Sequence, residues 1–192
     1  MTDIEFKLDP KHTAIVVIDL QKGISAYPTV HPFADVVANA ARLAKMFRRA
    51  GLPVILVTVS FSADGGDVLR PRVDVRRPLT PGPDFDRIVP ELGPERDDIL
   101  ITKRQQNAFY GTELELQLRR RQITGIVLCG IATGSGVDST ARAAYERAYN
   151  ITFASDAITD IDPAVHELEM AKIFPRLGEV DTTDAILGLV RR

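Results

Sequence analysis

The sequence predicts an α/β protein in which helices cover both faces of a parallel sheet. Short apolar runs rich in β-branched residues alternate along the chain with segments whose apolar residues follow helical spacing. Such alternation is typical of βαβ units with right-handed crossovers. With 192 residues and neither an internal repeat nor a linker, the chain is expected to form a single domain over residues 1–192.

The predicted strands come in order along the chain. The first, TAIVVIDL, is a nearly continuous β-branched run, as expected of a strand buried on both faces. The predicted strands are residues 13–20, 53–61, 98–103, 125–132 and 151–157, with a short edge strand at 178–180. Helical spacing is clearest in residues 33–51, where Gly51 ends the helix. Further helices are predicted at residues 111–122, 137–150, 163–174 and 182–192.

Residues 61–97 interrupt this alternation. They are rich in Pro, Gly and Arg and lack periodicity. A long connection of this kind inside a domain is usually a lid, a binding loop or a subunit contact. One or two of its arginines are expected to hold a substrate carboxylate, which suits the planar guanidinium; the alternative is a solvated loop. The candidate arginines are Arg70, Arg72, Arg76 and Arg77.

Composition excludes several classes of function. A net charge of −2 leaves no broad basic surface for nucleic acid. No apolar run approaches the about 20 residues of a membrane span, and the polar N-terminus has no signal-peptide core, so a cytoplasmic protein is expected. One cysteine excludes an internal disulfide and a thiolate cluster, and the three histidines lack ligand spacing. Neither a metal nor another cofactor is expected.

Polar residues stand where three of the predicted strands end. Asp19 ends the first strand, Lys103 ends the third, and the segment CGIATGSGVDST carries the chain from the fourth strand into a helix. Ligands of open α/β sheets bind outside the carboxyl ends of the strands. The first N–H groups of a helix have no partners within it and favour negative charge. We therefore expect Asp19 and Lys103 to share one pocket with this corner.

The segments IVVIDLQKG, ITKRQQNAFYGTELE and CGIATGSGVDSTARAAYERAYNITFASDA resemble, in order and spacing, the three signature segments of the isochorismatase-like hydrolase superfamily. The resemblance covers nearly the whole chain. It implies a three-layer α/β/α sandwich and a homo-oligomer that acts on a small-molecule substrate. Most members use an Asp, a Lys and a Cys. Asp19 and Lys103 match the first two, whereas Gly136 stands at the position of the cysteine.

Gly136 cannot form the thioester intermediate of the cysteine-dependent members. Cys129 lies inside an apolar strand and is expected to be a packed, inert thiol. The metal site of nicotinamidases is also expected to be absent, because VTVSFSADGGD has no His. True isochorismatases likewise carry a glycine at this position and hydrolyse a vinyl ether. By resemblance, Asp19 acts as the general acid that protonates the enol-pyruvyl methylene carbon, water captures the oxocarbenium ion, and pyruvate leaves.

Several alternatives stay open. A general acid needs a raised pKa, whereas a nearby Lys103 lowers it; either Lys103 pairs with substrate carboxylates, or Asp19 stays ionised and activates water as a base. A missing cysteine also fits another cysteine-free hydrolysis or an inactive small-molecule binder. A weaker alternative is a dinucleotide site through GSGVDS at 134–139, with Asp156 as the ribose-binding acid.

Further residues are candidates for contacts with substrate. Gln21 follows Asp19 and could orient substrate or water, while Tyr27 and Phe109 either wall the pocket or pack in the core. Ser135 lies at the corner, as a contact or as a helix cap. The resemblance also implies a cis peptide bond between Ile131 and Ala132. The candidate substrate-binding residues are thus Gln21, Tyr27, Phe109, Ile131, Ala132 and Ser135, beside the candidate catalytic residues Asp19, Lys103 and Gly136.

Overall fold

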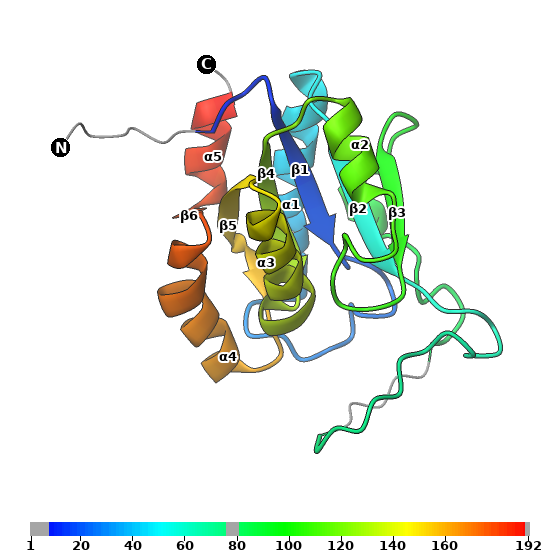
Figure 1. Cartoon of the computed structure of the whole chain (residues 1–192). Coiled ribbons are helices and arrows are strands. Elements are labelled where there is room, and N and C mark those ends of the chain that lie inside the picture. The colour runs from blue at the N-terminus through cyan, green and yellow to red at the C-terminus, as the bar shows by residue number, and fades with distance from the viewer. Residues whose placement is uncertain (1–7, 76–80, 191–192) are drawn as a thin grey trace.

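Six parallel strands form one sheet in the computed structural model, which describes residues 8–75 and 81–190 (Figure 1). The strand order is β3-β2-β1-β4-β5-β6, and every neighbouring pair is parallel. The strands are β1 (Thr13–Ile18), β2 (Val54–Val59), β3 (Ile99–Lys103), β4 (Gly125–Ile131), β5 (Asn150–Thr159) and β6 (Glu179–Asp181). The predicted parallel α/β class is confirmed.

Helices cover both faces of this sheet, which makes a three-layer α/β/α sandwich. They are α1 (Phe33–Arg49), α2 (Leu114–Arg120), α3 (Asp138–Glu146), α4 (Pro163–Leu168) and α5 (Thr183–Val190). The α1 and α5 helices pack together on one face, and α2 and α3 lie on the other (Figure 1). Within the described residues, no helix is long and apolar enough to span a bilayer.

Element boundaries differ from the prediction at several ends. The α2 helix is shorter at both ends than predicted, α3 ends at Glu146 instead of residue 150, and the last part of the predicted helix 163–174 is a π-helical turn at Glu169–Ile173. The helix predicted from residue 137 starts at Asp138, after a π-helical turn at Thr133–Val137. The β5 strand runs two residues past its predicted end, to Thr159, because a register shift against β4 lets the ladder resume at Gly130. The turn at Thr133–Val137 and the register shift both lie where β4 ends, beside β1.

The order of the strands places a crevice at the end of β1. The chain passes from β1 to β2 and β3 on one side, and returns to β4 on the other, so the connections diverge at this point. Gly130 has a φ of 118°, and a Cβ there would lie 2.0 Å from the carbonyl oxygen of Ile18. Only glycine tolerates both conditions, so Gly130 allows the end of β4 to touch the end of β1.

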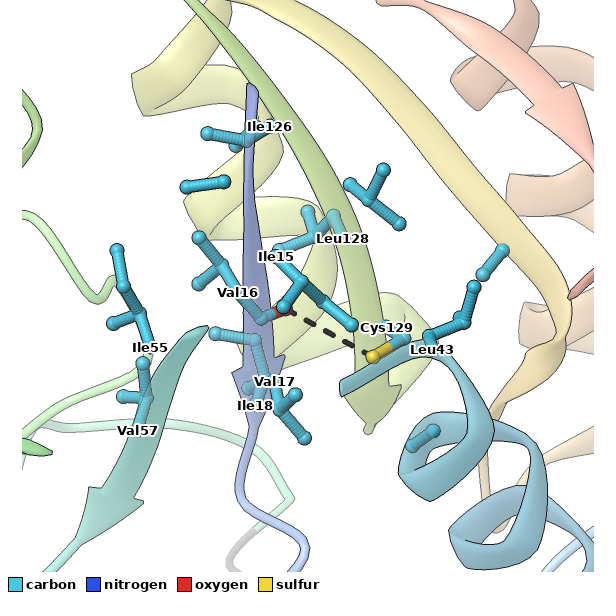
Figure 2. Packing of buried hydrophobic residues seen from close by; sticks show 14 of the residues in the cluster. Ile15, Val16, Val17, Ile18, Leu43, Ile55, Val57, Ile126, Leu128 and Cys129 are labelled. Carbon is cyan, nitrogen blue, oxygen red and sulfur yellow. Dashed lines mark hydrogen bonds between the residues drawn. The ribbon is translucent and has the colours of Figure 1, made fainter. Parts of the chain in front are cut away.

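The core lies on both sides of β1, whose six residues are all buried. Figure 2 shows Cys129 of β4 packed near Leu43 of α1, with its Sγ directed at the carbonyl oxygen of Val16, 4.0 Å away. Cys129 is fully buried, and burial raises the pKa of its thiol. The prediction of a packed thiol is therefore confirmed.

The segment between β2 and β3, described at residues 60–75 and 81–98, leaves the body of the molecule as an extended arm (Figure 1). Its regular structure in the described part is small: a 3₁₀ turn at Pro90–Leu92 and an isolated bridge between Ile88 and Gln21. It replaces the crossover helix that usually joins two parallel strands. The arm thus supplies a wall to the crevice where a helix would have covered the sheet.

Candidate active site

A cleft of about 1150 Å³ opens at the carboxyl ends of β1, β2 and β3. Asp19, which follows β1, Lys103, which ends β3, and Gly136, in the turn after β4, all line it. Residues from the arm form much of the remaining lining. The prediction that Asp19 and Lys103 share one pocket with the corner is therefore confirmed.

Asp19 and Lys103 form a buried ion pair. Lys103 Nζ donates a 2.7 Å hydrogen bond to Asp19 Oδ2 and a second, of 2.9 Å, to the carbonyl oxygen of Gln106. The two residues are 6% and 2% exposed, respectively. The backbone of Asp19 has a φ of 54°, in the left-handed region that Asp tolerates better than most residues. The chain thus turns sharply at Asp19 as β1 ends.

Burial dominates the protonation of Asp19. Its Oδ1 is buried and has no hydrogen-bond partner among the described residues. A charged carboxylate is costly in such a place. Burial raises the pKa of Asp19 to about 6, although the Lys103 ammonium acts to lower it. Burial therefore moves the titration of Asp19 toward neutral pH.

Gly136 places no side chain beside the carboxyl group of Asp19. A Cβ built on Gly136 would lie 3.2 Å from Asp19 Oδ2, 3.0 Å from Ile18 Cγ2 and 3.2 Å from the carbonyl oxygen of Ile131. A side chain at this position would therefore start beside the carboxyl group of Asp19 and be tightly packed. The position at which the resemblance places a cysteine lies next to the Asp19–Lys103 pair, and here it holds no nucleophile.

The corner after β4, residues Thr133–Val137, differs from the expected bed of free N–H groups. The Gly134 amide donates to Asp160 Oδ2 at 2.8 Å, and the amides of Ser135 and Val137 both donate to the carbonyl oxygen of Ala132. The expectation is wrong for these three amides, because the π-helical turn and Asp160 satisfy them. The peptide bond between Ile131 and Ala132 is cis, as the resemblance implied.

Gln21 does not face the cleft. It is fully buried, and its Nε2 donates to the carbonyl oxygens of Val59 and Phe85 while its Oε1 accepts from the Val59 amide. Its expected role as a contact for substrate or water is therefore wrong. Gln21 instead fastens the arm, through Phe85, to the end of β2.

The remaining candidate contacts divide between cleft and core. Tyr27 and Ser135 line the cleft, and no side-chain cap is formed by Ser135. Phe109 is 5% exposed and packs on the ring of Tyr149, so it belongs to the core. Ile131 is buried, and neither Ile131 nor Ala132 is among the residues that line the cleft, so their contact with substrate stays a prediction.

Among the loop arginines, Arg70 lines the cleft and Arg72 is exposed outside its lining. Arg76 and Arg77 fall outside the described residues. The sequence interpretation missed Arg104, which pairs with Asp67 and donates to the carbonyl oxygen of Ser60. Its position directly after Lys103 was the available signal. Arg104 therefore holds the first residues of the arm, Ser60 and Asp67, against the end of β3.

The dinucleotide alternative finds no support at Asp156. The side chain of Asp156 accepts hydrogen bonds from the amide and the hydroxyl of Thr183, where α5 begins. It is therefore committed to the start of a helix instead of a ribose. Over residues 8–75 and 81–190, no cluster of three or more His, Cys, Asp and Glu side chains is arranged to hold a metal ion.

Comparison with known proteins agrees with this geometry. The family model of the isochorismatase domain matches residues 13–185. The chain is 44% identical over 191 residues to the uncharacterized isochorismatase family protein YecD of Escherichia coli O157:H7, covering 95% of this chain and 98% of that one. It is 28% identical over 187 residues to the phenazine biosynthesis protein PhzD1 of Pseudomonas aeruginosa, covering 95% and 88%. A solved isochorismatase family protein from Burkholderia thailandensis has a TM-score of 0.92 and 43% identity, covering 96% and 98%.

Proposed function

The chain belongs to the isochorismatase family of hydrolases, and from that premise we propose that it hydrolyses a small carboxylated vinyl ether without a cysteine nucleophile. One observation carries the proposal. Asp19 has a pKa raised to about 6, and the neighbouring position, which holds the cysteine nucleophile in the cysteine-dependent members, is Gly136. A carboxyl group that keeps part of its protons near neutral pH suits a general acid, and vinyl-ether cleavage needs an acid but no covalent intermediate.

The reaction then follows from the groups in the cleft. Asp19 transfers its proton to the terminal methylene carbon of the enol-pyruvyl group, which leaves an oxocarbenium ion and the Asp19 carboxylate. Water adds to the cationic carbon and returns a proton to Asp19. The resulting hemiketal collapses to an alcohol and pyruvate. The Asp19 carboxylate, held in place by Lys103, stabilises the cation that forms beside it.

The substrate carboxylate has two candidate partners. Lys103 is bound to Asp19 and to a backbone carbonyl, whereas Arg70 on the arm forms no ion pair within the described part of the chain. A guanidinium binds a carboxylate through two parallel hydrogen bonds. We therefore propose Arg70 as the group that receives the carboxylate and leaves Lys103 paired with Asp19.

A pyruvate-release assay tests this function. Purified protein is incubated with enol-pyruvyl ethers, isochorismate among them, and pyruvate is followed through its reduction by lactate dehydrogenase. Carbamoyl acids and amides are screened in parallel. We expect pyruvate and the alcohol in equal amounts, and a loss of about 10²- to 10⁴-fold in Asp19→Asn, the range of general acid catalysis. The exposed Asp97→Asn is the matched control. Hydrolysis of amides without pyruvate release would count against vinyl-ether chemistry.

A second candidate follows from the 2.7 Å contact between Lys103 and Asp19, because this contact favours the ionised carboxylate. An ionised Asp19 would instead activate water as a base in another cysteine-free hydrolysis. If none of the screened compounds is hydrolysed, saturable binding of one of them in calorimetry would identify the protein as an inactive small-molecule binder. We also propose a homo-oligomer in the cytoplasm, which light scattering and cell fractionation test.

A further inference from the structure

A second polar cluster reaches the corner through α4. Nδ1 of His166 lies 2.7 Å from Oγ1 of Thr133, the first residue of the corner, and Thr133 is fully buried. The neighbouring Val165 packs on the next residue, because a Cβ on Gly134 would lie 2.2 Å from Val165 Cγ1. The helix and the corner are therefore in direct contact, with no spare room between them.

The same imidazole contacts a second segment of the cleft. The ring of His31 meets that of His166 edge to face, with centroids 4.8 Å apart and planes at 73°. The His31 amide also donates to Thr159 Oγ1, which anchors the segment to the end of β5. Tyr27, four residues before His31, lines the cleft. His166 thus stands between two segments that both reach the cleft.

The environment of His166 keeps it neutral. Burial and the neighbouring His31 lower the pKa of His166, while the Asp160 carboxylate acts in the opposite direction. Because an ordinary histidine has a pKa near 6.5, a lowered pKa leaves the imidazole mostly uncharged at pH 7. Asp160 is itself occupied, since it accepts from the amides of Gly134, Ile161 and Asp162. The neutral ring can hold Thr133 without adding a charge beside the corner.

We propose that His166 is a positioning residue, which through Thr133 sets where Gly136 stands relative to Asp19. His166 does not line the cleft, so it has no direct contact with substrate. A small shift of the corner changes the space beside Asp19, because a Cβ built on Gly136 would lie only 3.2 Å from Asp19 Oδ2. The consequence for turnover rests on the function proposed above, whereas the consequence for the geometry of the corner does not.

Four variants test this role. His166→Phe keeps the volume of the ring and its contact with His31 but removes both nitrogens, and His166→Asn keeps a polar atom near the place of Nδ1. Thr133→Val removes the hydroxyl from the other side. His12→Phe is the control, because His12 precedes β1 and pairs with Asp9, at the other end of the sheet from the cleft. Amide NMR spectra and hydrogen exchange report on the corner in each protein.

We expect His166→Phe and Thr133→Val to move the Ser135 and Gly136 amide resonances and to speed hydrogen exchange at Gly134 about tenfold, as the loss of one hydrogen bond implies. His166→Asn should restore most of both, and His12→Phe should change neither. With a vinyl ether as substrate, kcat should fall about tenfold to a hundredfold in His166→Phe with KM little changed, as a displacement near 1 Å produces.

The proposal would be overturned if the Ser135 and Gly136 amide resonances of His166→Phe did not move. It would also be overturned if His166→Asn changed the resonances and the exchange rate as much as His166→Phe does. If His166→Phe does not fold, Thr133→Val and His166→Asn decide the same question, because the first should disturb the corner and the second should not. If the unmodified protein releases no pyruvate, the function proposed above fails, while the spectra still decide whether His166 positions the corner.

Discussion

The balance between burial and Lys103 at Asp19 is open to a thermodynamic test. Asp19→Asn replaces the carboxyl group by an amide of the same shape that does not titrate. Other titrating groups are common to both proteins, so the difference in free energy of unfolding between them isolates Asp19. If burial dominates, the folded protein holds the Asp19 proton more tightly than the unfolded chain does, and the stability of the unmodified protein relative to Asp19→Asn falls as pH rises.

The magnitude follows from the shift itself. The pKa of Asp19 rises from 3.8 to about 6, and one pKa unit corresponds to about 1.4 kcal/mol. Stabilisation from the retained proton is fully present below pH 3.8 and is lost as pH rises through about 6. The difference between the two proteins should change by about 3 kcal/mol in full, and by about 2 kcal/mol between pH 4 and pH 7.5.

Urea unfolding at intervals between pH 4 and pH 7.5 measures this difference, with Asp97→Asn as the exposed-carboxyl control. A constant difference would refute the raised pKa. A difference that grows with pH would show that the attraction of Lys103 outweighs burial and that Asp19 is ionised. That outcome would favour the water-activating role over the general acid.

Three further predictions follow from buried contacts. Gly136→Ala adds a methyl group 3.0 Å from Ile18 and 3.2 Å from Asp19, so the free energy of unfolding in urea should fall by about 1–3 kcal/mol, and pyruvate release should also fall; two unchanged values would contradict the packing. Gln21→Leu removes the acceptor of the Val59 amide and the Nε2 donor to the Val59 and Phe85 carbonyl oxygens, although Phe85 still accepts from the Gly23 amide, so the free energy of unfolding should fall by about 2 kcal/mol, with faster proteolysis of the arm; equal proteolysis would argue against the anchor. Iodoacetamide should leave Cys129 unmodified in the folded protein by mass spectrometry; rapid labelling would show that the thiol is accessible.

Local pattern was sufficient for the fold class and for the expectation that Asp19 and Lys103 share a pocket. The β1 strand and the α1 helix are each marked by residues that are close together in the sequence, so the hydrophobic periodicity predicted both elements. Asp19 and Lys103 could be brought together because parallel strands that end in polar residues place them on one edge of the sheet. Gly136 was identified by its place in a family motif, which also depends only on order and spacing.

Tertiary structure decided the features that depend on partners far apart in sequence. Gln21 is an anchor because its amide meets Val59 and Phe85, and Phe109 is a core residue because Tyr149 covers it. The contact of His166 with Thr133 likewise joins segments that no local pattern connects. The pKa of Asp19 is the sum of burial, which raises it, and Lys103, which lowers it. A sequence names both groups, but only the packed chain sets how much water each has lost, and desolvation decides which of the opposing effects is larger.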